Sequence, residues 1–169
     1  AGSKGVPGKN KACIRGKPVI EYTVSATGAA KSVCGIIVTT DDPDIIEYYR
    51  GREDIFLVVR RPELSQDDTK SSDVVAHAIG AWEGSGRHVP GSLLLAQPTT
   101  PLRTSADIDR AFELFLMGGR PSLVSACKAE GIRHPRVMYR LTSDGLCGTN
   151  YVEDHNEDFR RQDYEAVYQ

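Results

Sequence analysis

The first ten residues, AGSKGVPGKN, hold the clearest candidates for chemistry in this chain. They combine three glycines with Lys4 and Lys9 and contain no acidic residue. Glycine allows main-chain N–H groups to approach an anion closely, and lysine supplies positive charge, so the segment predicts a phosphate-binding loop. It is not a Walker A loop, because five residues separate Gly2 from Gly8 and Asn10 stands where a Ser or Thr would hold magnesium. On these residues alone, a mobile terminal tail is the alternative.

The elements that must position this loop follow from hydrophobic patterning. Short apolar, β-branched runs predict buried strands, and segments with helical spacing lie between them. The predicted strands are residues 33–40, 55–59, 92–96 and 122–127, and the predicted helices are 18–30, one beginning at 43, 72–82 and 104–119. This alternation predicts parallel strands joined by right-handed crossovers, and hence a three-layer α/β sheet. A further strand at 136–141 precedes a polar and irregular end.

Capping residues mark the ends of the predicted helices. Asp42 precedes Pro43, which combines an N-cap acid with a proline at the first helical position. Thr104 or Ser105 is expected to cap the last of these helices, and glycines 118–119 are expected to end it.

Composition limits the function classes. The 169 residues suffice for one soluble domain, and 21 Lys plus Arg nearly balance 23 Asp plus Glu, so no overall field favours DNA, RNA or a membrane surface. No apolar run is long enough to cross a bilayer. The four cysteines form no CxxC pair and no zinc-binding spacing, which indicates free thiols in a reducing compartment. We therefore expect a cytoplasmic protein.

The loops at the expected ligand-binding edge carry a family pattern. In an open parallel sheet the ligand lies beyond the carboxyl ends of the strands, which here selects residues 1–17, 39–42, 60–72 and 97–103. These loops contain GSKGVPGKN followed by GKP, then VTTDDP, RPELSQDDTKSSD and QPTTPLRT, and RRQD follows at 160–163. In this order, over nearly all of the chain, the stretches closely resemble the cytidylyltransferases that activate sialic acids and related nonulosonic acids, the CMP-sialic acid synthetases.

The resemblance implies a fold and a reaction. The family's fold is a doubly wound, mostly parallel α/β sheet of the nucleotidyltransferase, Rossmann-like kind. Its reaction couples CTP to a 2-keto sugar acid, with Mg²⁺ as cofactor, to give a CMP-sugar and pyrophosphate. The family usually works as a homodimer. We expect residues 1–169 to be one cytidylyltransferase catalytic domain, with about 128–165 as its dimerisation and sugar-binding insertion.

The resemblance also implies roles for individual residues. Lys9 and Lys4 would be catalytic, by stabilising charge on the phosphates. The nucleotide-binding residues would be Gly2, Ser3, Lys4, Lys9, Asn10, Ser72 and Gln97. The residues facing the sugar acid would be Arg103, Arg161 and Gln162, and arginine suits that role because it binds carboxylates in a bidentate fork. No side chain is expected to form a covalent intermediate, because phosphoryl-type transfer needs mainly alignment and neutralisation of charge.

Departures from the family pattern lead to further expectations. Family members begin with a buried strand that ends in an arginine just before the glycine loop, and Ala1 stands where they usually have glycine. They also continue past the position of Gln169 to a pair of aspartates that bind Mg²⁺, so no metal ligand is expected within this chain. The chain thus resembles a partial domain that lacks the first strand and the C-terminal part. We expect this stretch to be weakly folded or inactive alone.

Alternatives to the sialic-acid reading stay open. One is the same chemistry on legionaminic, pseudaminic or 3-deoxy-octulosonic acid. A second is a non-catalytic relative that binds a nucleotide or a sugar. A third is a structural α/β domain without a ligand.

Overall fold

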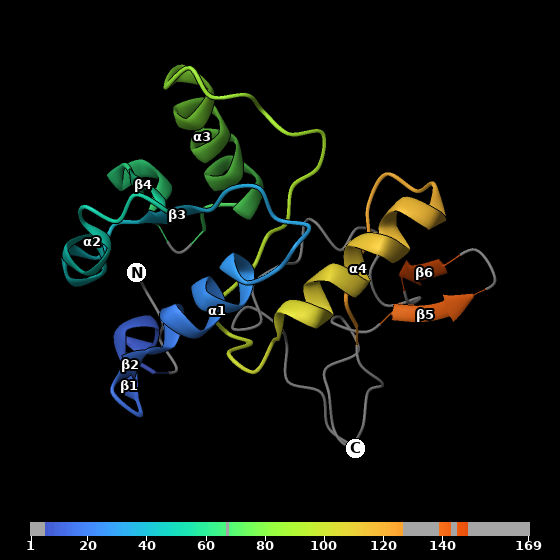
Figure 1. Cartoon of the computed structure of the whole chain (residues 1–169), viewed down its shortest axis with the longest axis horizontal. Helices are drawn as coiled ribbons and strands as arrows, with labels where there is room; N and C mark the ends of the chain where they lie inside the picture. Colours follow the sequence, from blue (N-terminus) through green and yellow to red (C-terminus); the bar gives the residue numbers. More distant parts are fainter. Residues whose placement is uncertain (1–5, 67, 127–138, 143–144, 149–169) are drawn as a thin grey trace. The chain divides into compact units, whose positions relative to one another are not determined.

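The computed structural model describes residues 6–66, 68–126, 139–142 and 145–148 (Figure 1). The chain divides into two compact units, Ala1–Leu123 and Val124–Gln169. The elements of the first unit are, in order, η1 (Lys9–Lys11), β1 (Cys13–Ile14), β2 (Lys17–Pro18), α1 (Val19–Gly28), β3 (Ile37–Thr40), α2 (Pro43–Tyr49), β4 (Phe56–Val59), η2 (Pro62–Leu64), α3 (Ser71–Gly84) and α4 (Ser105–Gly118). Among the helices so described, none has the length and apolarity needed to cross a membrane.

A parallel pair of strands lies at the centre of the first unit. β3 pairs with β4 in a register that sets Val38 opposite Leu57 and Thr40 opposite Val59. The helix α2 connects the two strands, so the predicted strand–helix–strand order is confirmed here, and with it the α/β class. Arg60 extends the ladder, because its N–H donates to the Thr40 carbonyl oxygen at 2.8 Å.

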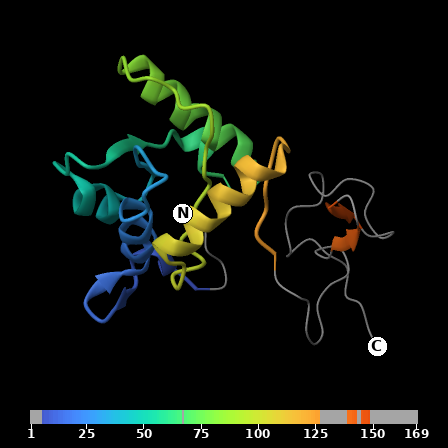
Figure 2. The same ribbon diagram turned by 45° about the vertical axis from the view of Figure 1, so that its right-hand side comes forward.

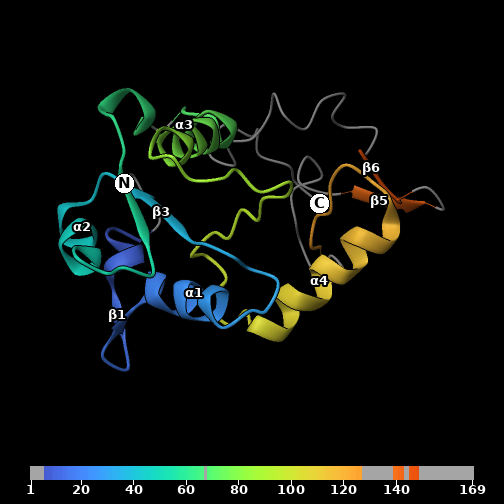
Figure 3. The same ribbon diagram turned by 45° about the horizontal axis from the view of Figure 1, so that its top comes forward.

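Helices cover both faces of this pair. On one face, Ile20 of α1 and Tyr49 of α2 join Val38 in a buried core. On the other face, Trp82 of α3 meets Phe56 of β4 edge to face, with ring centroids 5.3 Å apart. Figure 2 and Figure 3 show α1 and α3 on opposite sides of β3. Each strand therefore buries apolar side chains in both directions, as its near-continuous apolar sequence predicts.

The predicted helix caps are confirmed. The Asp42 side chain accepts from the Asp44 N–H at the start of α2. Thr104, rather than Ser105, caps α4, in a capping box that it completes with Asp107. Gly119 ends α4 in the left-handed region at φ 57°, where glycine has no steric cost.

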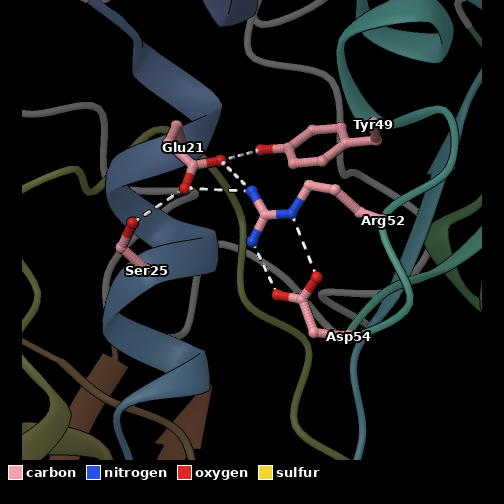
Figure 4. A network of polar contacts seen from close by, with 5 residues as sticks. All are labelled: Glu21, Ser25, Tyr49, Arg52 and Asp54. Atoms are coloured by element: carbon pink, nitrogen blue, oxygen red, sulfur yellow. Dashed lines mark hydrogen bonds and ion pairs between the residues drawn. The ribbon is translucent and has the colours of Figure 1, made fainter.

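The buried carboxylate of Glu21 connects α1 to α2 and to the loop that follows α2 (Figure 4). Glu21 accepts from the Tyr49 hydroxyl and from Ser25, both at 2.9 Å, and from the Arg52 guanidinium at 3.1 Å. Arg52 also pairs with Asp54 at 2.6 Å. Burial, together with the hydrogen bond to Glu21, raises the pKa of the Tyr49 hydroxyl well above its usual range. The network is satisfied on all sides, which is the condition for a carboxylate to be tolerated in a core.

Two of the predicted strands are not formed. Residues 92–96 and the described residues 122–126 have extended sequence patterns but no ladder, and Cys127 lies outside the described residues. Leu93, Leu94 and Leu95 are 55%, 51% and 58% exposed. A parallel strand exists only where a neighbour supplies hydrogen bonds, and no described strand of this unit pairs with these segments. An apolar run alone was therefore insufficient to predict a strand at these two positions.

A small hairpin interrupts the predicted opening loop. β1 and β2 pair antiparallel through Arg15 and Gly16, which both have positive φ, 49° and 78°. Two such residues form the turn that matches the twist of a two-residue hairpin. The hairpin leads directly into α1, which begins one residue after the predicted Pro18.

The second unit contains one antiparallel hairpin among its described residues. β5 (Tyr139–Thr142) pairs with β6 (Gly145–Gly148), and Leu141 lies opposite Leu146. The strand predicted at 136–141 is thus confirmed in its second half. The rest of the predicted insertion, about 128–165, lies outside the described residues.

Candidate functional site

The described part of the glycine–lysine segment is a tight turn. The Lys9 N–H donates to the Val6 carbonyl at 3.2 Å, and the Lys11 N–H donates to the Gly8 carbonyl at 3.0 Å. Gly8 lies in the left-handed region at φ 64°. Lys9 and Asn10 follow it in η1. The segment from residue 6 onward is therefore an ordered turn rather than a tail, while Gly2, Ser3 and Lys4 lie outside the described residues.

The two lysines of this turn have different surroundings. The Lys11 ammonium contacts Asp44 at 2.7 Å and Asp42 at 3.2 Å. Its hydrogen bonds, first to Asp44 and then to Asp42, raise the pKa of Lys11. No carboxylate of the described residues forms an ion pair with Lys9, which is partly buried. Of the two lysines in the described turn, Lys9 is therefore the one whose charge is not compensated by an ion pair.

The turn is fixed to the start of α1 as well. The Val19 N–H donates to the Ala12 carbonyl at 2.9 Å, and the Tyr22 hydroxyl donates to the Ile14 carbonyl at 2.6 Å. Because Asp42 follows β3 and caps α2, the Lys11 contacts bring the turn to the carboxyl end of β3. This is the edge of a parallel sheet where ligands bind.

A cavity of about 870 Å³ opens beside this edge, between α1, β3, α3, α4 and residues 92–98. Most of its wall is apolar, but polar side chains lie at or after the carboxyl ends of β3, β4 and residues 92–96. These side chains are Thr39, Arg60, Gln66, Thr69, Ser71 and Gln97. Its volume is in the range of small-molecule sites, which are mostly apolar with a few placed polar groups.

Two buried polar groups in this wall have no partner among the described residues. One Arg60 Nη donates to the Thr39 carbonyl at 2.9 Å, while Arg60 Nε and Thr39 Oγ1 have no hydrogen bond although they are inaccessible to solvent. Buried donors and acceptors are normally satisfied. A donor and an acceptor without a partner therefore lie at the end of two parallel strands, the place where ligands bind in such sheets.

The predicted site residues do not all meet. Gln97 lines the cavity, but Lys9, Asn10, Ser72 and Arg103 are not part of its wall. The Ser72 hydroxyl lies 3.4 Å from Asp73 on the exposed start of α3. Arg161 and Gln162 lie outside the described residues. The structure thus places Lys9 and Gln97 in separate features, the turn and the cavity.

Three contributing residues were missed in the sequence. Thr39 and Arg60 lie in two of the loops that the carboxyl-end rule selected, 39–42 and 60–72, but neither was named as a site residue. Lys11 was passed over because its partners lie 31 and 33 residues further along the chain.

The described residues do not form a metal centre. No group of three His, Cys, Asp or Glu side chains within them is placed to hold a metal ion. Asp42 and Asp44, at the edge of the sheet, already bind Lys11, and Asp42 also caps α2. These carboxylates do not fit a Mg²⁺ site.

Comparisons with known proteins give a consistent result. Residues 1–125 match a family model described as cytidylyltransferase. The N-acylneuraminate cytidylyltransferase of Streptococcus agalactiae serotype V is 32% identical over 173 residues, which cover 99% of this chain and 39% of that protein. The chain therefore spans about two fifths of the length of the first curated relatives it matches.

More distant relatives act on other sugar acids by name. The CMP-N,N'-diacetyllegionaminic acid synthase of Legionella pneumophila is 30% identical over 125 residues, covering 74% of this chain and 53% of that protein. The pseudaminic acid cytidylyltransferase of Campylobacter jejuni serotype O:2 is 28% identical over 129 residues, covering 76% and 55%. The similarity therefore includes relatives named for two of the alternative sugars.

Proposed function

Because the chain belongs to the cytidylyltransferase family, we propose that it carries the nucleotide-binding part of an enzyme that couples CTP to a sialic-acid-type nonulosonic acid. The observation that carries the proposal is the ordered turn at the carboxyl end of β3, where Lys9 is the uncompensated cation, in a chain whose residues 1–125 match that family. The Streptococcus agalactiae relative, which matches 99% of this chain, acts, by its name, on N-acylneuraminate. The same chemistry on legionaminic or pseudaminic acid is the second candidate, favoured by the relatives named for those sugars.

The proposed reaction is a nucleotidyl transfer. The 2-hydroxyl oxygen of the sugar forms a bond to the α-phosphorus of CTP, the bond from that phosphorus to the β-phosphate oxygen breaks, and pyrophosphate leaves while the hydroxyl proton is lost. Negative charge grows on the phosphate oxygens, and Lys9 with the main-chain amides of the turn stabilises it. Lys4 is proposed to share this role. Mg²⁺, as the proposed cofactor, would neutralise phosphate charge, held by residues outside the described part.

The polar edge of the cavity, where β3 and β4 end and outside its apolar part between Val38 and Leu94, is proposed to take the remainder of the nucleotide. Gln97 and Arg60 present hydrogen-bonding groups from its wall, and the Thr39 hydroxyl adds a further one. Asn10 and Ser72 are proposed to complete the nucleotide contacts. Arg103, Arg161 and Gln162 are proposed to face the sugar acid, whose carboxylate an arginine can bind.

Turnover of the protein at its full natural length tests the function. CMP-sugar formation from CTP, Mg²⁺ and N-acetylneuraminate, legionaminic acid or pseudaminic acid would be followed in parallel. We expect the highest kcat/KM with N-acetylneuraminate and a loss of roughly 100-fold to 1,000-fold in Lys9→Ala, the range for removal of one charge-stabilising group. Lys31→Ala, an exposed lysine after α1 and outside the loops of the ligand-binding edge, is the control. CTP binding without any product would overturn the catalytic proposal.

The finer fold is also a proposal. We propose that the complete sheet is doubly wound and three-layered, with an additional extended strand in the cavity between β3 and residues 92–96. Protein interiors rarely leave such a volume unfilled, and both walls are apolar: Val38 on one side and Leu94 on the other line the same space. Amide hydrogen exchange tests it. At full natural length the amides of residues 93–95 should be protected, whereas fast exchange there would exclude a paired strand.

The assembly is proposed to be a cytoplasmic homodimer that uses about 128–165. Light scattering of the full-length protein, with and without this segment, would check the dimer.

A further inference from the structure

Lys11 is placed to hold the phosphate-binding turn against the sheet. It is one of two lysines in η1, and its ammonium lies 2.7 Å from Asp44 and 3.2 Å from Asp42. Asp42 is only 10% exposed at its side chain and is itself held, because it caps α2 and its N–H donates to Thr40 Oγ1 at 3.1 Å. Lys11 therefore connects a surface turn to a fixed point at the carboxyl end of β3.

The stem of Lys11 also shapes the turn. A Cβ built on Gly8 would lie 3.3 Å from Lys11 Cε and 3.6 Å from its Cγ. The methylene chain thus lies across the glycine before the ammonium reaches the two carboxylates. A long side chain can cover a backbone in this way while its charged end is bound elsewhere. Gly8 is needed both for its positive φ and for the space that Lys11 occupies.

The neighbouring Lys9 shows the opposite environment. No carboxylate of residues 6–66, 68–126, 139–142 or 145–148 forms an ion pair with it. Two lysines of one turn therefore differ, since one is neutralised and held while the other is uncompensated. A ligand-binding cation needs an available charge and a fixed backbone. Here Lys9 provides the available charge, and Lys11 fixes the backbone of the turn.

We propose that Lys11 is a positioning residue that aligns the Lys9 turn through its ion pairs with Asp42 and Asp44. The inference rests on the proposed function of the same turn as a CTP phosphate site. Lys11 does not contact the phosphates in this scheme. It acts through Lys9, and its loss leaves the turn able to move away from the edge of the sheet.

A double-mutant cycle in the full-length protein tests the proposal. We expect Lys11→Ala to lower kcat/KM for CTP about tenfold when Lys9 is present, and to change it less than twofold in a Lys9→Ala background, because residues that act as a unit are not additive. Lys11→Arg should restore most of the loss, since a guanidinium can pair with both carboxylates. Lys31→Ala is the matched control and should leave both backgrounds unchanged.

A carboxylate variant separates positioning from simple repulsion. Lys11→Ala leaves Asp44 unpaired, and its charge could repel CTP. Asp44→Asn breaks the same contact while it removes negative charge, so positioning predicts a several-fold rise in KM for CTP, and repulsion predicts no rise. Exposed ion pairs add little to global stability, so the thermal midpoint of Asp44→Asn should stay close to that of the wild type. This variant also covers the case in which Lys11→Ala folds poorly.

The outcomes distinguish the two proposals. If the wild type forms no CMP-sugar with any of the three sugar acids, the proposed function fails. If the wild type is active and Lys9→Ala is impaired, but Lys11→Ala and Asp44→Asn match Lys31→Ala, the positioning role is wrong. Equal losses from Lys11→Ala in both backgrounds would overturn it too, because Lys11 would then act independently of Lys9.

Discussion

Two regions of the first unit have similar apolar content but different burial. Around β3 and β4, Ile45 and Tyr49 are 3% and 1% exposed. Beside the cavity, Leu93 and Leu95 are 55% and 58% exposed, although their sequence is as apolar as that of β4. In the first region the core is buried by helices and strands that follow one another along the chain between residues 19 and 59. The second has no such neighbour among the described residues. Burial thus depends on a partner surface as well as on residue type.

The largest expected effect tests the closed region against the open one. Tyr49→Ala should lower the free energy of unfolding by about 3–5 kcal/mol, the usual cost of removing a buried aromatic ring. Leu94→Ala should change it by less than about 0.5 kcal/mol, as for a surface position. Urea denaturation of the two variants of this chain measures both. Similar losses in both variants would mean that residues 92–96 are buried in solution and that the contrast is wrong.

The polar network sharpens the contrast inside the closed region. Glu21→Gln should destabilise the fold by about 2 kcal/mol, because the hydrogen bonds it weakens involve charged and buried groups, while Arg52 keeps Asp54 as a partner. Glu47→Gln is the matched control, since Glu47 pairs with Arg50 at the surface with 73% of its side chain exposed, and it should have no measurable effect. Chemical denaturation at neutral pH compares the two. An equal response would indicate that Glu21 is solvated rather than buried.

The same contrast explains what the sequence could predict. Local signals were reliable: Asp42-Pro43 predicted the start of α2, and the apolar runs at 33–40 and 55–59 predicted β3 and β4, which the structure forms over Ile37–Thr40 and Phe56–Val59. Contacts between distant residues gave no such signal. Glu21 was not expected in a core, because its partners Tyr49 and Arg52 lie 28 and 31 residues away.

The candidate site divides in the same way. The glycine–lysine spacing predicted a loop that contains Lys9, and the family resemblance named Gln97, which lines the cavity. The pairing of Lys11 with Asp44 could not be predicted, since it depends on how β3 is placed beside η1. Pattern-based prediction failed at 92–96 for a related reason, because a ladder is a property of two segments.

A smaller effect is expected at the cap of α4, which borders the open region. Thr104→Ala should cost about 1 kcal/mol, since it removes the acceptor for the Asp107 N–H and one half of the capping box. Ser105→Ala, one residue further along, should be nearly neutral because Ser105 is the first residue of the helix. Thermal unfolding followed by circular dichroism compares them. If Ser105→Ala were the more harmful change, the cap would be wrongly placed.

The smallest effect concerns the contact that holds α4 to the loop after α1. Asp109 accepts from the Ser32 hydroxyl at 2.7 Å, from the Ser32 N–H at 2.9 Å and from the Lys31 N–H at 3.1 Å. These bonds, first that of the Ser32 hydroxyl, lower the pKa of Asp109 below its ordinary value of 3.8. A carboxylate with a lowered pKa stabilises the folded state fully above the ordinary value, and the contribution is lost as the pH falls through the lower, folded value.

Asp109→Asn should therefore reduce the thermal midpoint slightly at pH 7, and the difference from the wild type should shrink below about pH 4, where the wild-type carboxylate becomes protonated. Asp73→Asn is the control, because within the described residues the Asp73 carboxylate forms a side-chain hydrogen bond only with the Ser72 hydroxyl, at 3.4 Å. Thermal melts of the three proteins between pH 3 and pH 7 measure the difference. A gap that widened on acidification would have the opposite sign to that required by a lowered pKa, and would show that α4 is held to the loop by other contacts.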